Sequence, residues 1–189
     1  KNKNLINLGG KPIIFYSINE AINSKIFDKV IVTTDSEKIA RTARMFGAET
    51  PFIRPKNLAD KSADLISVAK HTLEKIEKRN ILPDLVYVVT ESFPLREQNL
   101  LEMMLNKLKR NGLETVAASK KEKAGIWLKD ISQKKFKNIV DNVTPGDLRE
   151  NESFIVPLGL GHLTYAHVLR AGKFLDTNII NKSKTVESK

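Results

Sequence analysis

The sequence contains no cysteine, which excludes disulfide bonds, catalysis by a thiol and zinc sites with thiolate ligands. It also lacks long apolar runs, because segments such as residues 85–89 are far shorter than the roughly 20 residues that cross a bilayer. No hydrophobic segment of the secretory-signal type is visible. We therefore expect a cytoplasmic protein without a membrane partner.

Acidic residues are the minority charge in this chain. There are 22 Asp and Glu residues against 32 Lys and Arg residues, and the net charge is +10. Such a chain can bind nucleic acid, anionic lipid or a small anionic substrate. However, most lysines are dispersed or stand beside glutamates, as in residues 74–78, which is typical of a solvated helix face. An RRM aromatic signature, zinc-finger spacing and an Arg-rich arm are missing, so we expect no nucleic-acid partner.

The first two thirds of the chain alternate between apolar runs and amphipathic segments. With 189 residues, the chain is long enough to bury the core of one domain. The alternation predicts an α/β fold with an open, mostly parallel, doubly wound sheet and right-handed crossovers. The expected helices are residues 12–24, 37–46, 62–78 and 96–111, and the expected strands are 30–34, 49–53, 85–90 and 114–118.

The pattern changes after residue 118. Short strand-like runs and turns replace the alternation, and a short helix is expected at residues 167–171, followed by a polar tail without a clear element. We interpret residues 119–189 as an antiparallel flap or dimerisation extension on an α/β core of residues 1–118, within a single domain of residues 1–189. The expected strands of this part are residues 125–129, 136–143 and 153–156.

Polar side chains follow three of the predicted strands. Thr34, Asp35 and Ser36 follow the first, Arg54 follows the second, and Thr90-Glu91-Ser92 follows the third. In open α/β sheets, ligands bind beyond the carboxyl ends of the strands. Together with Lys3 and Asn4 ahead of the first helix, this rim offers cations, hydroxyls and carboxylates. That mixture suits a phosphate ester with a divalent metal.

Each of these residues also has a simpler interpretation. Asp35 fits the N-cap of the following helix, Arg54 fits a surface residue before a proline, and Lys1 and Lys3 fit solvated charges at the end of the chain. The convergence of several strand ends on one rim favours the functional interpretation.

Three segments, in this order, resemble the acylneuraminate cytidylyltransferases, which make CMP-activated sialic acids and related nonulosonates. They read K-N-K-N-L-I-N-L-G-G-K-P-I-I-F-Y-S-I, F-D-K-V-I-V-T-T-D-S-E-K-I-A and F-G-A-E-T-P-F-I-R-P-K-N-L-A. The match runs from residue 1 to residue 59 and continues loosely to Pro94-Leu95-Arg96. The resemblance implies a Rossmann-like nucleotide-diphospho-sugar transferase fold. It also implies Mg²⁺-dependent transfer of CMP from CTP to the anomeric hydroxyl of an acidic sugar, with release of pyrophosphate, by a homodimer.

The resemblance also implies roles for individual residues. Lys3 matches a lysine that meets the CTP phosphates, Asn4 its neighbour at the nucleotide, and Arg54 an arginine of the nucleotide site. Arg149 and Asn151 match an Arg-x-Asn segment near the sugar. The expected catalytic residues are Lys3, Asp35 and Arg54; the expected nucleotide-binding residues are Lys3, Asn4, Arg54, Thr90 and Ser92; the expected substrate-binding residues are Thr90, Arg149 and Asn151.

Parts of the family pattern are expected outside these residues. Lys3-Asn4-Leu5 matches the end of the family's phosphate loop, so the first strand and the Gly-rich part of that loop are expected on the amino side of Lys1. The family's metal-binding aspartate pair is expected beyond Lys189, so no metal ligand is assigned here. The expected dimer contacts are residues 125–130 and the segment after Asn151.

The sequence departs from the family at several positions. Thr90 stands where the family has a sugar-contacting glutamine, and Glu91 and Phe93 replace a proline and a serine. Gly159-Leu160-Gly161-His162 has no counterpart. Its glycines fit either close approach to a sugar or a bent strand, and His162 fits either a general base or a core or surface histidine. Two alternatives therefore stay open: a nucleotidyltransferase for another sugar or alcohol, and a catalytically degenerate nucleotide-binding scaffold.

Overall fold

The computed structural model of the protein describes residues 3–60, 63–122, 127–130, 135–138, 154–172 and 184–187. Arg149 and Asn151, two of the predicted site residues, lie outside these ranges, as do residues 139–143 of an expected strand. None of the helices in the described ranges is long and apolar enough to cross a membrane.

The chain enters the fold through a short 3-10 turn and a tight hairpin. The turn η1 (Lys3–Leu5) leads into β1 (Asn7–Leu8) and β2 (Lys11–Pro12), which pair antiparallel. The hairpin turns at Gly9 and Gly10, whose positive φ angles of 56° and 86° favour glycine. Helix α1 (Ile13–Asn23) follows Pro12 and buries Ile14 and Ile18, one helical turn apart. The helix predicted at residues 12–24 is confirmed.

Two further helices begin at side-chain caps. At α2 (Glu37–Met45), the Ser36 Oγ accepts a hydrogen bond from the Ile39 amide at 3.4 Å. At α3 (Leu65–Glu77), the Asp64 carboxylate accepts one from the Ser67 amide at 2.8 Å. α2 lies where it was predicted, α3 begins at Leu65 instead of residue 62, and η2 (Lys56–Leu58) is a short turn between them. Because Ser36 caps α2, capping does not explain Asp35.

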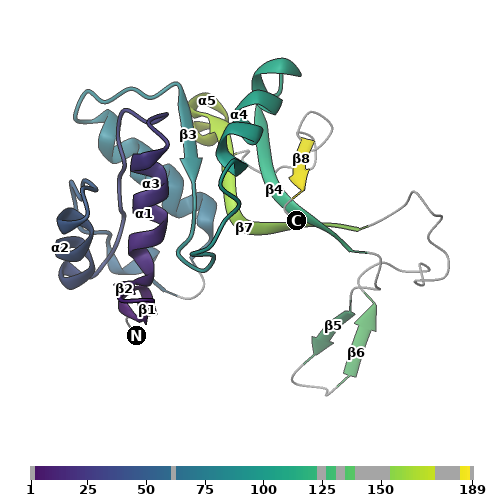
Figure 1. The fold of residues 1–189 in the computed structure, drawn as a ribbon, viewed down its shortest axis with the longest axis horizontal. Coiled ribbons are helices and arrows are strands. Elements are labelled where there is room, and N and C mark those ends of the chain that lie inside the picture. The colour runs from purple at the N-terminus through teal and green to yellow at the C-terminus, as the bar shows by residue number, and fades with distance from the viewer. Residues whose placement is uncertain are drawn as a thin grey trace.

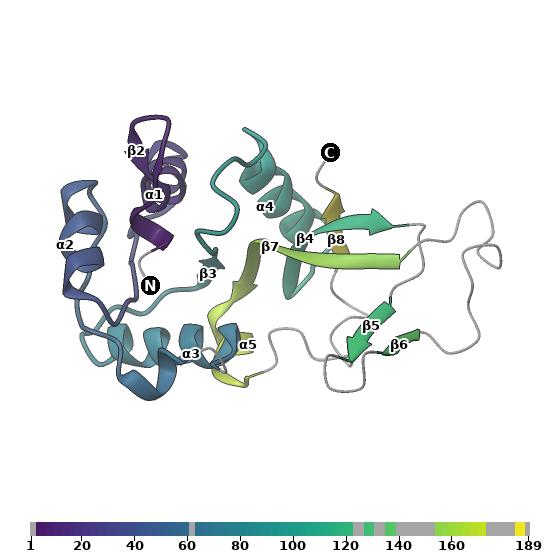
Figure 2. The same cartoon turned by 90° about the horizontal axis from the view of Figure 1, so that it is seen from below.

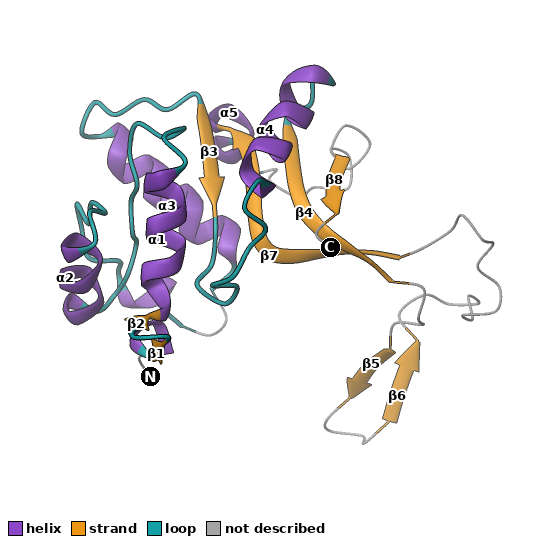
Figure 3. Cartoon of the chain, viewed as in Figure 1, coloured by secondary structure: helices purple, strands orange, loops and turns teal. Residues whose placement is uncertain are grey.

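The strands predicted at residues 30–34 and 49–53 are present only as a parallel bridge between Ile31 and Glu49. The Glu49 amide donates to the Val30 carbonyl at 2.8 Å, and the Val32 amide donates to the Glu49 carbonyl at 2.9 Å. Figure 3 shows this part of the chain as loop. The two segments run side by side as predicted, but the outer edge of residues 30–32 faces a cavity, so the ladder does not extend to a second partner among the described residues.

The main described sheet has four strands in the order β3-β7-β4-β8. β7 lies antiparallel to both β3 and β4, and β8 lies parallel to β4. β8 is a correction to the prediction, which gave the tail no clear element; its pairing with β4 is a long-range contact that local pattern does not encode. The bounds are β3 (Leu85–Val88), β4 (Thr115–Glu122), β7 (Phe154–Tyr165) and β8 (Lys184–Glu187).

β7 is one bulged strand where two separate segments were predicted. Ala117 pairs with His162 and Ser119 pairs with Pro157, so β7 places residues 158–161 opposite Ala118 alone. Extra residues on one strand bend it and raise its twist. The bent-strand interpretation of the Gly159–His162 stretch is therefore confirmed for the backbone.

Helices cover both faces of the sheet. In Figures 1 and 2, α1 and α4 (Leu100–Arg110) lie on one side, and α3 and α5 (Ala166–Arg170) lie on the other. β3 serves both layers by strand alternation: Leu85 and Tyr87 pack against the cluster around α4, while Val86 and Val88 pack against α3 and α5. The strands β5 (Trp127–Asp130) and β6 (Lys135–Asn138) form a separate antiparallel pair.

Helix α4 begins later than predicted, at Leu100 instead of residue 96. Residues 89–99 form no helix or strand, and this segment carries Thr90, Glu91 and Ser92. From Leu100 onward, Met104 and Leu108 are fully buried against β4 and β7, as the helical spacing predicts. The core thus places a long loop at the end of β3, next to the carboxyl ends of residues 30–34.

Candidate active site at the carboxyl ends of the strands

The predicted rim residues line one cavity of about 1400 Å³. The cavity opens where residues 30–34 and β3 end. Ser92 is not among the lining residues but contacts Lys3. The predicted rim residues in the lining are Lys3, Asn4, Thr34, Asp35, Ser36, Arg54, Thr90 and Glu91.

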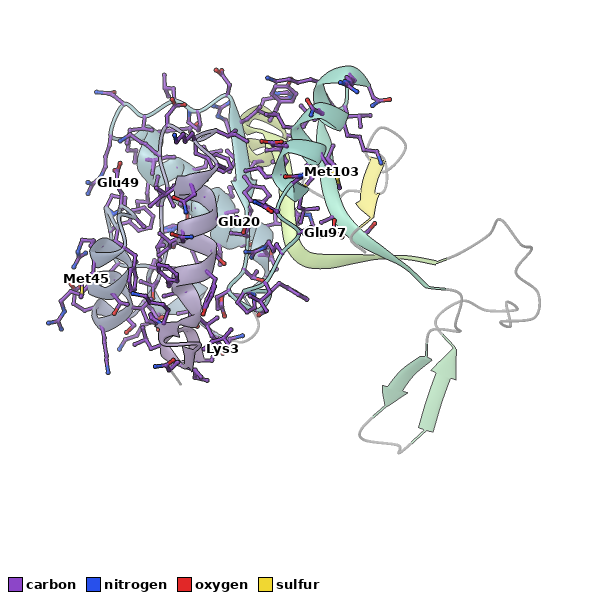
Figure 4. All side chains as sticks on the ribbon, viewed as in Figure 1. Lys3, Glu20, Met45, Glu49, Glu97 and Met103 are labelled. Carbon is purple, nitrogen blue, oxygen red and sulfur yellow. The ribbon has the colours of Figure 1, made fainter. Side chains whose placement is uncertain are left out.

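Lys3 reaches across the rim to the loop after β3. Its Nζ lies 3.1 Å from Glu91 Oε1 and 3.4 Å from Ser92 Oγ. The Lys3 side chain is 67% exposed, so its ammonium is accessible to an anionic ligand. In Figure 4, Lys3 lies at the lower end of α1. An exposed ammonium beside the Ser92 hydroxyl suits the oxygens of a phosphate.

Asp35 is exposed at the rim because the turn before α2 holds it there. The Ser36 amide donates to the Thr34 hydroxyl at 3.1 Å, and Thr34 itself is buried. This hydrogen bond and the Ser36 cap fix the residues on both sides of Asp35 and leave its carboxylate at the cavity. The Asp35 side chain is therefore available to a ligand, because it does not cap α2.

Arg54 is anchored by its backbone and has an unsatisfied side-chain donor. Its amide donates to the Thr34 carbonyl at 2.8 Å, which ties the ends of the two parallel segments together. The Nε of Arg54 is buried and has no hydrogen-bond partner among the described residues, and the same holds for the hydroxyl of Thr33. Buried polar atoms are normally satisfied, so two such atoms on one cavity point to a polar ligand. Pattern reasoning missed Thr33, because a threonine inside an apolar strand reads as core.

His71 lies on α3, close to Arg54. Burial is the main cause that lowers its pKa, and the positive charges of Lys75 and Arg54 add to this effect, while Glu74 opposes it. The imidazole is therefore neutral near pH 7 and contributes no charge to the rim. Its edge contact with Phe52 fits the structural role that its helical position predicts.

The cavity continues from the rim into an apolar slot between two backbone segments. Residues 30–32 form one wall and β3 forms the other, with α1 and α3 above and below; the lining continues to Pro83 and Asp84 at the amino end of β3. β3 is the outermost strand of its sheet, so its free edge faces the slot. The cavity of about 1400 Å³ is larger than a usual small-molecule pocket of about 300–1000 Å³, and protein interiors rarely leave voids larger than a water molecule.

The described residues do not make a metal site. No group of three potential metal-ligating side chains occurs among them. The two carboxylates of the rim are Asp35 and Glu91, and Glu91 is paired with Lys3. Mg²⁺ prefers several oxygen ligands in near-octahedral geometry. These residues by themselves therefore do not fit a resident magnesium ion.

His162 and Gly161 belong to the core and not to the cavity wall. His162 is 4% exposed in β7, pairs with Val88 of β3, and has a pKa lowered by burial. A Cβ atom on Gly161 would lie 2.4 Å from the Tyr87 hydroxyl oxygen, so glycine is needed there for the tyrosine to pack. Burial also raises the pKa of Tyr87 far above its usual value. This geometry favours the structural interpretation of both residues.

Comparison with known proteins adds a family to this geometry. The sequence model of the cytidylyltransferases matches residues 1–148. The pseudaminic acid cytidylyltransferase of Campylobacter jejuni is 38% identical over 109 residues, which are 58% of this chain and 47% of that protein. The CMP-N,N'-diacetyllegionaminic acid synthase of Legionella pneumophila is 29% identical over 129 residues, or 68% and 56%. The chain therefore spans about half the length of the curated relatives that it matches.

Solved structures share the fold at low sequence identity. A CMP:2-keto-3-deoxy-manno-octonic acid synthetase in complex with CTP aligns with a TM-score of 0.66 at 14% identity, covering 98% of this chain and 83% of that one. A 4-diphosphocytidyl-2C-methyl-D-erythritol synthase from Anaerococcus prevotii aligns with a TM-score of 0.65 at 14% identity, covering 100% and 85%. The predicted α/β nucleotidyltransferase fold is confirmed.

Proposed function

The chain belongs to the cytidylyltransferase family, and we propose from this that it transfers CMP from CTP to the anomeric hydroxyl of a nonulosonate-type acidic sugar. One observation supports this most strongly. Lys3, Asp35, Arg54 and Thr90 come from four separate segments, yet they line one cavity at the carboxyl ends of the strands. Three relatives are named as enzymes for pseudaminic, N,N'-diacetyllegionaminic and N-acylneuraminic acids, which supports an acidic sugar as the acceptor.

The proposed reaction is a displacement at phosphorus. The sugar hydroxyl oxygen forms a bond to the α-phosphorus of CTP, the bond to the bridging oxygen breaks, and pyrophosphate leaves with the electron pair. The hydroxyl proton passes to a base or to water. Catalysis of this kind depends mainly on positioning and charge stabilisation. Lys3 would neutralise phosphate oxygens, the free Nε of Arg54 would donate to a nucleotide oxygen, and Thr90 and Ser92 would orient the reactants.

We further propose that the phosphate-binding loop and a strand leading into it are supplied by residues on the amino side of Lys3. The apolar slot supports this proposal, because it lies between two unpaired backbone edges and ends beside Lys3 and Asn4. A parallel strand placed there would pair with both edges and fill the void.

Magnesium dependence, dimer formation and a cytoplasmic location are parts of the same proposal. The described residues lack a magnesium cluster, so we assign no metal ligand and route no step through the ion. The family resemblance supports magnesium dependence and dimer formation, and the cytoplasmic location is the expectation drawn from the sequence. Magnesium titration of pyrophosphate release, sedimentation and cell fractionation test them in turn.

The function is tested by pyrophosphate release from the full-length protein with CTP and a panel of acidic sugars, with GTP, ATP and UTP in parallel. We expect turnover with CTP and at least one nonulosonate. Arg54→Met should lower kcat/KM by about 100-fold, because it removes a charged donor from the reacting centre. Turnover with a neutral sugar or alcohol instead would favour another nucleotidyltransferase, and CTP binding without turnover would favour a degenerate scaffold.

A further inference from the structure

The loop that carries Thr90, Glu91 and Ser92 has no regular structure of its own. It connects β3 to α4 through residues 89–99 and lies beside α1. A loop without regular backbone hydrogen bonds of its own keeps one conformation only where side-chain contacts hold it. An active-site loop of this kind therefore needs an anchor close to the residues that it presents.

Arg96 is such an anchor. Its Nη2 donates to the Thr90 carbonyl at 2.7 Å, and its Nη1 donates to Glu20 Oε2 at 2.8 Å and to Ser17 Oγ at 3.1 Å. The Arg96 side chain is 1% exposed, whereas the Glu20 side chain is 26% exposed. The two arms of the guanidinium thus join the start of the loop to α1. A buried charge of this kind is tolerated only when it is paired and hydrogen-bonded.

Arg96 acts from behind the site and not from inside it. It is absent from the lining of the large cavity, but lines a second cavity of about 440 Å³ with Glu20 and Glu97. Figure 4 labels these two glutamates. Thr90 and Ser17, which accept its hydrogen bonds, line the large cavity. Arg96 therefore forms part of the wall between the cavities and reaches the rim through Thr90.

The opposite side of the loop is held by Lys3, through Glu91 and Ser92. Lys3 lies ahead of α1, to which Arg96 ties the loop. Arg96 therefore joins α1 to the loop, and Lys3, which precedes α1 in the chain, contacts the same loop. A shift of the loop away from α1 would move Thr90 and also Glu91 and Ser92, the contacts of Lys3.

We propose that Arg96 is a positioning residue for the transfer reaction, fixing Thr90–Ser92 and Lys3 relative to each other while touching no substrate. This inference rests on the proposed function. Arginine suits the role because its planar guanidinium presents donors in a fixed fork, which a lysine ammonium cannot reproduce at both partners.

The test compares Arg96→Lys with Arg170→Lys in the full-length protein. Arg170 also pairs with a glutamate, since its Nε lies 2.7 Å from Glu77 Oε1, but it joins α5 to α3 away from the loop. We expect Arg96→Lys to lower kcat about 10- to 100-fold with a smaller change in the KM for CTP, because misplaced groups lose transition-state contacts. Amide exchange in residues 89–99 should quicken about tenfold. The control should change kcat less than twofold.

A purely structural role predicts a different result: a lower melting temperature with unchanged kcat at a temperature where both variants are folded. That result, or unchanged exchange in residues 89–99, would overturn the proposal. If Arg96→Lys does not fold, Glu20→Gln replaces it, because this substitution keeps a hydrogen-bond acceptor and removes the charge. We expect it to lower kcat and to quicken exchange in residues 89–99, both by less than Arg96→Lys. No change in either quantity would also overturn the proposal. If the wild-type protein shows no turnover, the proposed function fails, whereas the exchange measurement still tests the anchor.

Discussion

At the scale of single residues, the rim holds a pair of opposite charges that a bound triphosphate would have to rearrange. Lys3 Nζ lies 3.1 Å from Glu91 Oε1, and the lysine is largely exposed while the glutamate is 22% exposed. The resemblance to the acylneuraminate cytidylyltransferases places Glu91 where that family has a proline. The Glu91 carboxylate competes with an anionic ligand for the same ammonium.

Removing the charge of Glu91 should therefore strengthen the binding of anions. We expect Glu91→Gln to tighten CTP binding about two- to fivefold, a small effect because exposed ion pairs contribute little. The gain should shrink at high salt, which screens the repulsion between the carboxylate and the phosphates. Titration calorimetry at two salt concentrations measures both effects.

Glu49→Gln is the matched control, because Glu49 also pairs with a lysine, Lys29, at 2.8 Å, and it does not line the cavity. It should leave CTP affinity unchanged. Equal effects of the two substitutions would mean that only the net charge matters, and weaker binding by Glu91→Gln would show that Glu91 assists the ligand.

The buried histidine His162 predicts a pH dependence of stability. Burial lowers its pKa, so the folded state takes up its proton at lower pH than the unfolded state, for which the value is near 6.5. Stability from this group is complete above pH 6.5 and is lost as the pH falls from there through the folded-state pKa. Urea unfolding at several pH values should show this loss, at most about 1.4 kcal/mol per pH unit. His162→Gln should flatten the slope, and an unchanged slope would assign it to other groups.

At the scale of elements, α3 depends on its N-cap residue, Asp64. The Asp64 carboxylate accepts hydrogen bonds from the Ser67 amide at 2.8 Å and the Ser67 hydroxyl at 2.6 Å. These bonds, that of the hydroxyl first, lower the pKa of Asp64 below its usual value near 3.8. The helix in turn covers one face of the sheet and one side of the slot.

Substitutions at Asp64 should separate capping from charge. Asp64→Ala should lower the melting temperature by about 2–4 °C, because it removes the cap. Asp64→Asn keeps a hydrogen-bond acceptor, so it should lower the melting temperature less than Asp64→Ala. It should also abolish the pH-dependent stabilisation that the Asp64 carboxylate provides. That stabilisation is present above pH 3.8 and lost as the pH falls through the lower folded-state value. Thermal melts between pH 3 and 7 check both, and equal losses for the two variants would argue against the cap.

At the scale of the whole molecule, the apolar slot is a large departure from close packing in the described residues. Val30 and Val32 pack toward α1 and α2, while Val86 and Val88 of β3 pack toward α3 and α5, yet all four remain only partly buried. Residues 30–32 therefore have the sequence of a core strand, but within the described part of the chain one of their edges has no neighbouring strand.

The strand proposal predicts that a protein containing this strand is more stable than residues 1–189 alone. If the proposed strand fills the slot, the full-length protein should melt about 10 °C or more above a protein limited to the present 189 residues. The shorter protein should also bind the dye ANS, which reports exposed apolar surface. Equal melting temperatures and equal dye binding would contradict the strand proposal.

Local sequence pattern predicted much of this molecule. Helical spacing and capping residues located α1, α2 and α3, and apolar runs located β3 and β4. The strand ends predicted Asp35, Arg54 and Thr90 as rim residues, and the segment ahead of the first helix predicted Lys3; all four line one cavity. The three ordered segments indicated the family that the comparison then confirmed. These features depend on side chains within one or two turns of each other, so a single sequence encodes them.

Tertiary structure alone decided the rest. Local pattern did not predict that α4 starts at Leu100 or that β7 is a bulged antiparallel strand. It also did not predict that β8 pairs with β4, or that Ser36 and not Asp35 caps α2. Nor did it predict the links from Arg96 to α1 and from Lys3 to Glu91. Each joins residues far apart in the chain or selects between adjacent candidates by geometry. Their energies come from burial and from paired backbone edges, which exist only once the segments are packed together.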